Sequence, residues 1–257
     1  MDEPDSTPRP TPPSDEADAL RGRIAAEESR ILQEYARRLE VVEPDRYAAW
    51  DPAEAFLREG RRAAAAALLR DLGAFPLRGK ACLEVGCGAL GWLADLIGWG
   101  ADESDLHGIE LIPERRERAH GALPRADIRC GTATRLPWGD ATFRLVVLST
   151  VLSSVLDQAV RRRIAEETVR VLAPGGILLW YDFAVSNPWN PNVRGIPRRE
   201  VAALFEDLTG RFRSVSLAPP IARRLVPVSR LLAGLCEALP PLRTHLVGAL
   251  SKPFRGN

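Results

Sequence analysis

The chain has little lysine, little cysteine and no long apolar run. Each of these absences excludes a class of protein or of binding partner. Of its 35 basic residues only Lys80 and Lys252 are lysines, and the formal net charge is +1. A net charge so close to zero lacks the excess of positive charge that is typical of proteins that bind nucleic acid or an acidic membrane surface. No stretch of about 20 uninterrupted apolar residues is present, so the sequence predicts no membrane span. The preference for arginine and alanine indicates the coding bias of a high-GC, bacterial genome.

The four cysteines form no C-x-x-C pair, and the three histidines are far apart in the sequence. This spacing predicts reduced thiols and no bound metal, as in a cytoplasmic protein. The first residues are rich in proline and acid and lack the apolar run of a signal peptide. At 257 residues the chain is long enough for one domain with a helical extension.

The composition changes along the chain. The first 17 residues hold five prolines and several acids, which is typical of a disordered segment. Helical periodicity marks 18–40, and Pro44 separates this helix from a second one over 52–72. We therefore expect a disordered tail, an N-terminal helical lid region and a main domain, at residues 1–17, 18–73 and 74–257.

Strand and helix patterns alternate through the main domain, which indicates parallel βαβ units with helices on both faces of a sheet. The expected strands are 80–85, 105–110, 126–130, 143–149, 176–183, 211–217 and 243–250. The expected helices are 89–99, 113–120, 157–172, 197–209 and a proline-punctuated pair over 221–239. The apolar segment 219–241 is predicted to be a helical insertion before the last strand. It could touch a membrane as an amphipathic helix, but the lack of a basic face favours a substrate cover or a dimer surface.

A glycine-rich turn follows the strand at 80–85, with the sequence Glu84-Val85-Gly86-Cys87-Gly88-Ala89-Leu90-Gly91. Glycine tolerates positive φ and lets a ligand approach the backbone, so the turn predicts a nucleotide-type pocket. The glycine spacing also satisfies the dinucleotide fingerprint, which is a weak signal alone. A carboxylate at Glu84 would repel a pyrophosphate, which helix N-termini otherwise favour. It suits a ligand with an ammonium group and no phosphate, such as S-adenosylmethionine (SAM).

Three further motifs follow the turn in order. They read His107-Gly108-Ile109-Glu110-Leu111, then Leu136-Pro137-Trp138-Gly139-Asp140-Ala141-Thr142-Phe143, then Val169-Arg170-Val171-Leu172-Ala173-Pro174-Gly175-Gly176. With these motifs, residues 79–183 resemble the class I SAM-dependent methyltransferases, close to the type 11 group. The resemblance implies an α/β, Rossmann-like sheet of seven strands in the order 3-2-1-4-5-7-6, with the last strand antiparallel.

The resemblance also implies a SAM site at the carboxyl ends of the strands. Glu110 ends an apolar strand, where a carboxylate can accept both ribose hydroxyls, and Leu111 and Leu136 would enclose the adenine. Thr132 stands where the family usually has an acid for the adenine amine, so the threonine hydroxyl or the backbone would have to serve. For Ser149 and Thr150, plain helix capping is the alternative. The expected cofactor-binding residues are Glu84, Gly86, Cys87, Gly88, Gly91, Glu110, Leu111, Thr132, Ala133, Leu136, Ser149 and Thr150.

Aromatic and polar residues outside these motifs are candidates for binding the methyl acceptor. Some precede the main domain, where a helical lid can exclude water, although packing of helix on domain is the alternative. Others lie in 187–195, whose asparagines, tryptophan and arginine suit polar recognition, although turns favour asparagine and proline too. The expected acceptor-binding residues are Tyr35, Tyr47, Trp50, Tyr181, Asn187, Asn190, Asn192 and Arg194.

Methyl transfer from a sulfonium is an in-line displacement, so proximity and alignment supply much of the catalysis. A base is needed only where the acceptor must lose a proton. Asp182, at the carboxyl end of a strand, and His245, whose ordinary pKa is near neutrality, are the catalytic candidates. For His245 the alternative is a packed residue that opens the last strand.

The sequence thus predicts a methyltransferase that uses SAM, releases S-adenosylhomocysteine (SAH) and modifies a small molecule, at oxygen, in bacterial secondary metabolism or glycan tailoring. We expect a monomer or homodimer without nucleic-acid partners. A carboxyl or peptide methyltransferase is the alternative within enzymes. A SAM-binding protein without methyl transfer, such as a cyclase or a partner subunit, is the alternative outside methyltransferases, and Glu84 disfavours a dinucleotide oxidoreductase.

Overall fold

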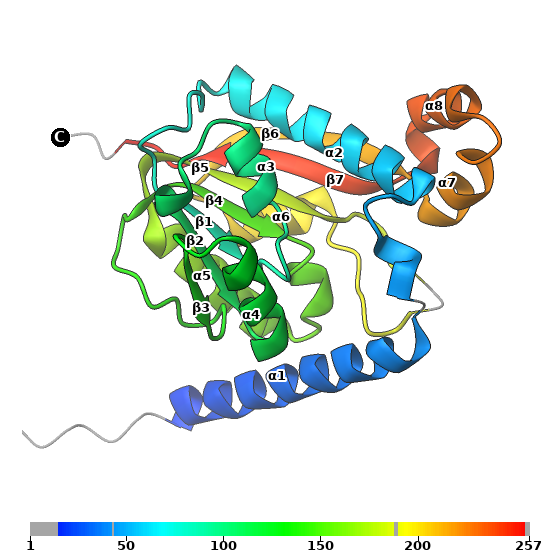
Figure 1. The fold of residues 1–257 in the computed structure, drawn as a ribbon. Helices are drawn as coiled ribbons and strands as arrows, with labels where there is room; N and C mark the ends of the chain where they lie inside the picture. Colours follow the sequence, from blue (N-terminus) through cyan, green and yellow to red (C-terminus); the bar gives the residue numbers. More distant parts are fainter. Residues whose placement is uncertain (1–14, 43, 188–189, 255–257) are drawn as a thin grey trace, which may run out of the picture.

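The strands form a single sheet in a computed structural model that describes residues 15–42, 44–187 and 190–254 (Figure 1). The sheet has seven strands in the order β3-β2-β1-β4-β5-β7-β6. They are β1 (Cys82–Val85), β2 (Leu106–Glu110), β3 (Asp127–Cys130), β4 (Phe143–Ser149), β5 (Leu172–Phe183), β6 (Thr209–Leu217) and β7 (Arg243–Ser251). β7 pairs antiparallel with β5 and β6, and the other pairs are parallel. The expected strand order, with its antiparallel last strand, is confirmed.

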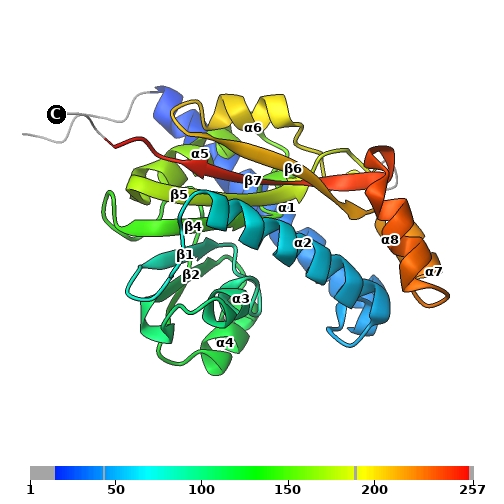
Figure 2. The ribbon, with the colours of Figure 1, turned by 90° about the horizontal axis from the view of Figure 1, so that it is seen from above.

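Helices cover both faces of the sheet. They are α1 (Asp15–Val41), α2 (Pro52–Asp71), α3 (Leu93–Gly98), α4 (Pro113–Ala122), α5 (Gln158–Val171), α6 (Arg198–Leu204), α7 (Pro219–Leu225) and α8 (Arg230–Ala238). Short 3-10 helices are η1 (Pro44–Tyr47), η2 (Glu103–Asp105), η3 (Leu152–Ser154) and η4 (Pro240–Leu242). Figure 2 shows α2, α3 and α4 on one face of the sheet and α1, α5 and α6 on the other. No helix in the described part of the chain is long and apolar enough to cross a membrane.

The sheet separates two hydrophobic clusters. Successive side chains along β5 point to opposite faces of the sheet and enter different clusters. Leu179 packs with the α2 and α3 residues, and Trp180 packs with the α5 residues. β1 is buried along its whole length, as expected for a central parallel strand covered on both faces. Because β1, β2, β4 and β5 run parallel, Glu110 at the end of β2 lies at the same edge of the sheet as the turn after β1.

Three helix boundaries differ from the sequence prediction by more than two residues. α6 ends at Leu204 rather than at 209, because 205–207 form a turn before β6. α1 begins at Asp15, so 15–17 are helical rather than part of a disordered tail, and the acids of this first turn favour a helix N-terminus. The rest of the predicted tail lies outside the described residues. The helix expected from residue 89 begins only at Leu93, because 90–92 form a turn.

The segment 219–241 forms α7 and α8, which pack on α2 through Ala222, Val226 and Ala233. The opposite face of α8 is exposed to solvent: Leu231 is 76% exposed and Leu235 60%. These leucines are thus available to another surface, and the role of 219–241 as a substrate cover or a dimer surface stays a prediction.

Candidate active site

The turn after β1 requires its glycines. Gly86, Gly88 and Gly91 have positive φ angles of 72°, 61° and 42°, in the region that other residues rarely adopt. A Cβ at Gly86 would lie 2.7 Å from Val151, and one at Gly91 would overlap the carboxylate of Glu84. The turn can therefore pack this closely against its neighbours only because these positions lack side chains.

Glu84 holds the turn against the amino end of α3. Its carboxylate accepts hydrogen bonds from the N–H of Trp92 at 2.8 Å and from the N–H of Leu93 at 3.0 Å. Burial raises the pKa of Glu84 to about 8, although these hydrogen bonds act in the opposite direction. The carboxylate points into the protein rather than to solvent, and its contact with a ligand ammonium group stays a prediction.

Glu110 joins the end of β2 to the same turn. Its Oε2 accepts the N–H of Gly88 at 2.8 Å, and its Oε1 accepts the N–H of Ile112 at 3.0 Å. The N–H groups of Gly86 and Cys87 both donate to the carbonyl of Ile109, at 2.8 and 3.1 Å. The structure therefore brings together the two sequence motifs that the SAM hypothesis requires.

Cys87 takes part in the turn through its backbone N–H, which donates to the Ile109 carbonyl. Its side chain is buried, its Sγ lies 3.0 Å from the position a Cβ would take at Gly108, and burial raises the pKa of the thiol far above its usual range. A thiol in this state is unreactive, so the side chain has a packing role.

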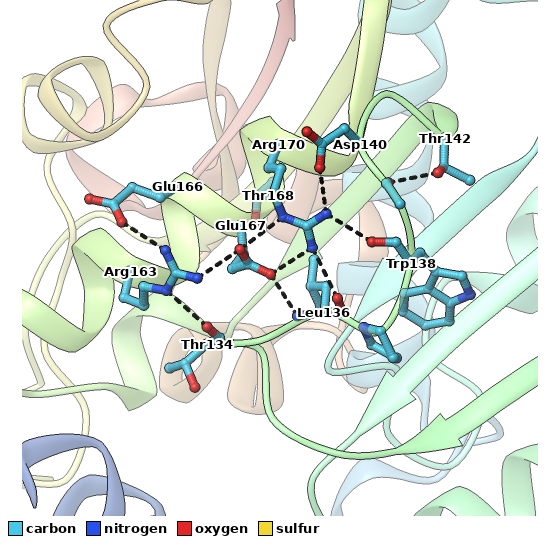
Figure 3. Close-up of polar contacts among 12 residues, drawn as sticks. Thr134, Leu136, Trp138, Asp140, Thr142, Arg163, Glu166, Glu167, Thr168 and Arg170 are labelled. Carbon is cyan, nitrogen blue, oxygen red and sulfur yellow. Dashed lines mark hydrogen bonds and ion pairs between the residues drawn. The ribbon is translucent and has the colours of Figure 1, made fainter. Parts of the chain in front are cut away.

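Residues 132–142 form a loop that α5 holds in place (Figure 3). The N–H of Leu136 donates to Oε2 of Glu167 at 2.8 Å, and Arg170 donates to the carbonyls of Leu136 and Trp138. Arg170 and Glu167 also pair directly at 2.7 Å. Burial tends to raise the pKa of Glu167, but its hydrogen bonds to Arg170 and the Leu136 N–H outweigh this and keep the pKa below its usual value.

Thr132 lies at the start of this loop. Its Oγ1 lies 2.8 Å from Oγ1 of Thr134 and accepts the N–H of Thr134. The hydroxyl thus closes a local turn in the place where the family usually has an acid. Its contact with adenine stays a prediction, as do those of Leu111, Ala133 and Leu136.

Asp182 lies where the catalytic prediction expects it, at the carboxyl end of β5. It is fully buried, and its two oxygens accept the N–H groups of Ser153 at 3.0 Å and Phe183 at 2.9 Å. Burial raises its pKa to about 6. Thr150, beside it at the end of β4, has a φ of 54° and donates its N–H to the Tyr181 carbonyl at 2.8 Å. A carboxylate with a pKa near neutrality is suited to accept a proton, although this role stays a prediction.

His245 and Tyr181 lie on the other face of the sheet, beneath α2. Their rings stack with centroids 5.1 Å apart, and the Tyr181 hydroxyl lies 3.1 Å from Oγ of Ser216. Burial, together with the charge of Arg61, lowers the pKa of His245 to about 3. This burial disfavours His245 as a base and favours the alternative of a packed residue, so its catalytic role stays a prediction. Tyr181 does not line the cavity where other acceptor candidates meet.

Several predicted acceptor residues do meet around a cavity of about 630 Å³ between α1, η1 and the 190–192 loop. Tyr47, Asn190 and Asn192 line it, and Nδ2 of Asn192 donates to Glu34 on α1 at 2.8 Å. No sequence motif predicts the residues on α1 and directly after it that also line this cavity, which are Glu34, Arg37, Arg38, Val41 and Val42.

The other acceptor candidates lie outside this lining. Trp50 is 71% exposed, Arg194 pairs with Glu200 at 2.7 Å, and Asn187 is exposed. Tyr35 lies near the cavity, since Arg38 lies over both its ring and that of Tyr47, with centroid distances of 5.7 and 6.0 Å.

Comparison with known sequences agrees with this architecture. Residues 83–180 match the family described as "Methyltransferase domain". A protein of Mycolicibacterium smegmatis described as a probable S-adenosylmethionine-dependent methyltransferase is 32% identical over 160 residues, 56% of this chain and 60% of that protein. The phthiotriol/phenolphthiotriol dimycocerosates methyltransferase 1 of Mycobacterium ulcerans is 33% identical over 135 residues, 49% of this chain and 47% of that protein. The matches therefore span about half to three fifths of the length of these relatives.

Solved structures share the fold at low sequence identity. The N-methyltransferase NodS of Bradyrhizobium japonicum, in complex with SAH, has a TM-score of 0.63 and 19% identity, covering 87% of this chain and 98% of that one. The cyclase SpnF has a TM-score of 0.55 and 18% identity, covering 75% of this chain and 81% of that one. Such likeness shows the fold alone, and the family follows from the sequence match and the motifs. Residues 83–180 carry a class I SAM-dependent methyltransferase domain of the type 11 family.

Proposed function

We propose that the protein transfers a methyl group from SAM to the hydroxyl of a small-molecule acceptor. The observation that supports this most directly is the hydrogen bond between the Gly88 N–H and Glu110, which holds a carboxylate suited to a ribose beside the glycine turn. The M. ulcerans relative, named for triol acceptors, supports oxygen as the methylated atom.

The turn fits SAM better than it fits a dinucleotide. A pyrophosphate needs free N–H groups at the glycine turn and at the following helix N-terminus. Here the N–H groups of Gly86 and Cys87 donate to Ile109, that of Gly88 to Glu110, and those of Trp92 and Leu93 to Glu84. The carboxylates and the glycine backbone remain as partners for hydroxyl and ammonium groups, since a carboxylate oxygen has a second lone pair.

SAM, when bound, supplies an electrophilic methyl group on a sulfonium. The contribution of the chain is to hold the ribose at Glu110, to enclose the adenine with Leu111 and Leu136, and to orient an acceptor. Polar groups of Glu34, Tyr47 and Asn192 around the cavity suit a hydroxylated natural product or glycan. Asp182 would accept the hydroxyl proton where the acceptor requires it. We further propose a cytoplasmic monomer or homodimer.

Two other activities are compatible with the fold. A carboxyl or peptide methyltransferase would use the same donor site, and SpnF illustrates that this fold also occurs in a cyclase. The test is incubation with a bacterial metabolite extract and trideuteromethyl-labelled SAM, followed by mass spectrometry. A labelled ether product supports the proposal, a labelled ester favours carboxyl transfer, and binding of SAM without any labelled product would contradict both.

A further inference from the structure

Arg115, on the first turns of α4, lies directly over the glycine turn. Its Nη2 is 2.9 Å from the position that a Cβ would take at Gly88. Its Cζ lies 4.8 Å from the ring centroid of Tyr35 on α1. The guanidinium is thus enclosed between the candidate cofactor site on one side and an aromatic ring of the N-terminal region on the other.

Tyr35 is held in this place by the anchoring of α1. Near its start, α1 pairs with the amino end of α5 through Arg23 and Asp157 at 2.8 Å. One turn further, Glu27 accepts the N–H of Leu156 and pairs with Arg30 at 2.7 Å. Beyond these anchors α1 continues past α4 (Figure 1), where Tyr35 meets Arg115.

Charge indicates what Arg115 binds. Both acids at the turn, Glu84 and Glu110, already accept main-chain N–H groups. No carboxylate in the described part of the chain lies within ion-pair distance of Arg115, whereas many other arginines have such a partner. SAM has one anionic group, the carboxylate of its methionine part, and a guanidinium is the natural partner of a carboxylate.

We propose that Arg115 binds the methionine carboxylate of SAM, and that the Tyr35 ring holds the guanidinium in place, which makes α1 part of the cofactor site. This inference rests on the proposed use of SAM. Tyr35, expected from sequence to contact the acceptor, acts here on the donor side.

Calorimetry with two ligands tests the proposal. SAH has the methionine carboxylate, whereas 5′-methylthioadenosine has the adenine, ribose and thioether but lacks the amino-acid part. Arg115→Met is expected to weaken SAH binding by about 10-fold or more, since a hydrogen bond to a charged group is lost, and to leave methylthioadenosine binding unchanged. Arg118→Met, at an exposed arginine of the same helix, is the control and should change neither.

Tyr35 supplies a second set of variants. Tyr35→Phe keeps the ring and should bind SAH as the unaltered protein does, whereas Tyr35→Ala should weaken SAH binding and add little to Arg115→Met. Equal loss of both ligands in Arg115→Met, or no loss of SAH binding, would overturn the proposal. If the unaltered protein binds neither ligand, the proposed function itself fails.

Discussion

The N–H of Gly88 donates to Oε2 of Glu110 at 2.8 Å, across 22 residues of sequence. This bond joins the turn after β1 to the end of β2, so the two motifs act as one unit. A change in either residue alters the other as well as the candidate cofactor site.

Glu110→Ala should therefore weaken SAH binding by about 10-fold or more, because it removes a charged acceptor and leaves the Gly88 N–H without its partner. Calorimetry measures the change. Glu114→Ala, at an exposed acid of the neighbouring helix, should leave the affinity unaltered. An unchanged affinity in Glu110→Ala would refute the ribose assignment.

Gly91→Ala should destabilise the fold by about 2 kcal/mol or more, because the new Cβ would overlap the Glu84 carboxylate and the φ of 42° disfavours alanine. Urea denaturation gives the free energy of unfolding. The control is Gly121→Ala, in α4, where a Cβ would meet nothing within 4 Å. Equal stability of the two variants would show that the turn does not need its third glycine.

Glu167→Ala should lower the free energy of unfolding by about 2–3 kcal/mol, since a buried carboxylate that pairs with Arg170 and accepts the Leu136 N–H is removed. Its neighbour Glu166 is largely exposed and pairs with Arg163 at 3.3 Å. Glu166→Ala should therefore cost less than about 1 kcal/mol. Similar losses in both variants would argue against a special role of Glu167 in holding the 132–142 loop.

His245 predicts a dependence of stability on pH. Its pKa is lowered from 6.5 to about 3, so between these values the unfolded chain binds a proton that the folded chain does not. Stability is then fully present above pH 6.5 and is lost as the pH falls toward 3, by up to about 1.4 kcal/mol per pH unit.

His245→Phe keeps a ring against Tyr181 and removes the titration. The free energy of unfolding, measured by urea denaturation from pH 7 to pH 4, should fall less steeply in this variant than in the unaltered protein. If the free energy of unfolding fell equally steeply with pH in both proteins, His245 would be accessible to protons in the folded state.

The alternation of apolar strands and helices predicts a parallel sheet, whereas the strand order could be predicted only through the resemblance of the ordered motifs to a known family. The position of Glu110 could be predicted because it ends an apolar strand. The hydrogen-bond partners of Glu84 could not be predicted, because the sequence shows only its spacing from the glycines, whereas the path of 90–92 brings the Trp92 N–H to its carboxylate. For His245, burial beneath α2 decides the pKa, and that burial involves residues distant in sequence.

Arg115 shows a similar limit. An arginine in a polar helix is expected to be solvated, and nothing in its local sequence relates it to Tyr35, 80 residues earlier. Arg115 and Tyr35 meet because α1 passes alongside α4 in the fold. Contacts between segments far apart in the chain, rather than local patterns, decide these parts of the site.

The central claim is that the glycine turn and Glu110 bind SAM rather than a dinucleotide. Calorimetric titration of the unaltered protein with SAH and, separately, with NAD tests it most directly. The account predicts saturable binding of SAH and none of NAD. Binding of NAD without binding of SAH would contradict it.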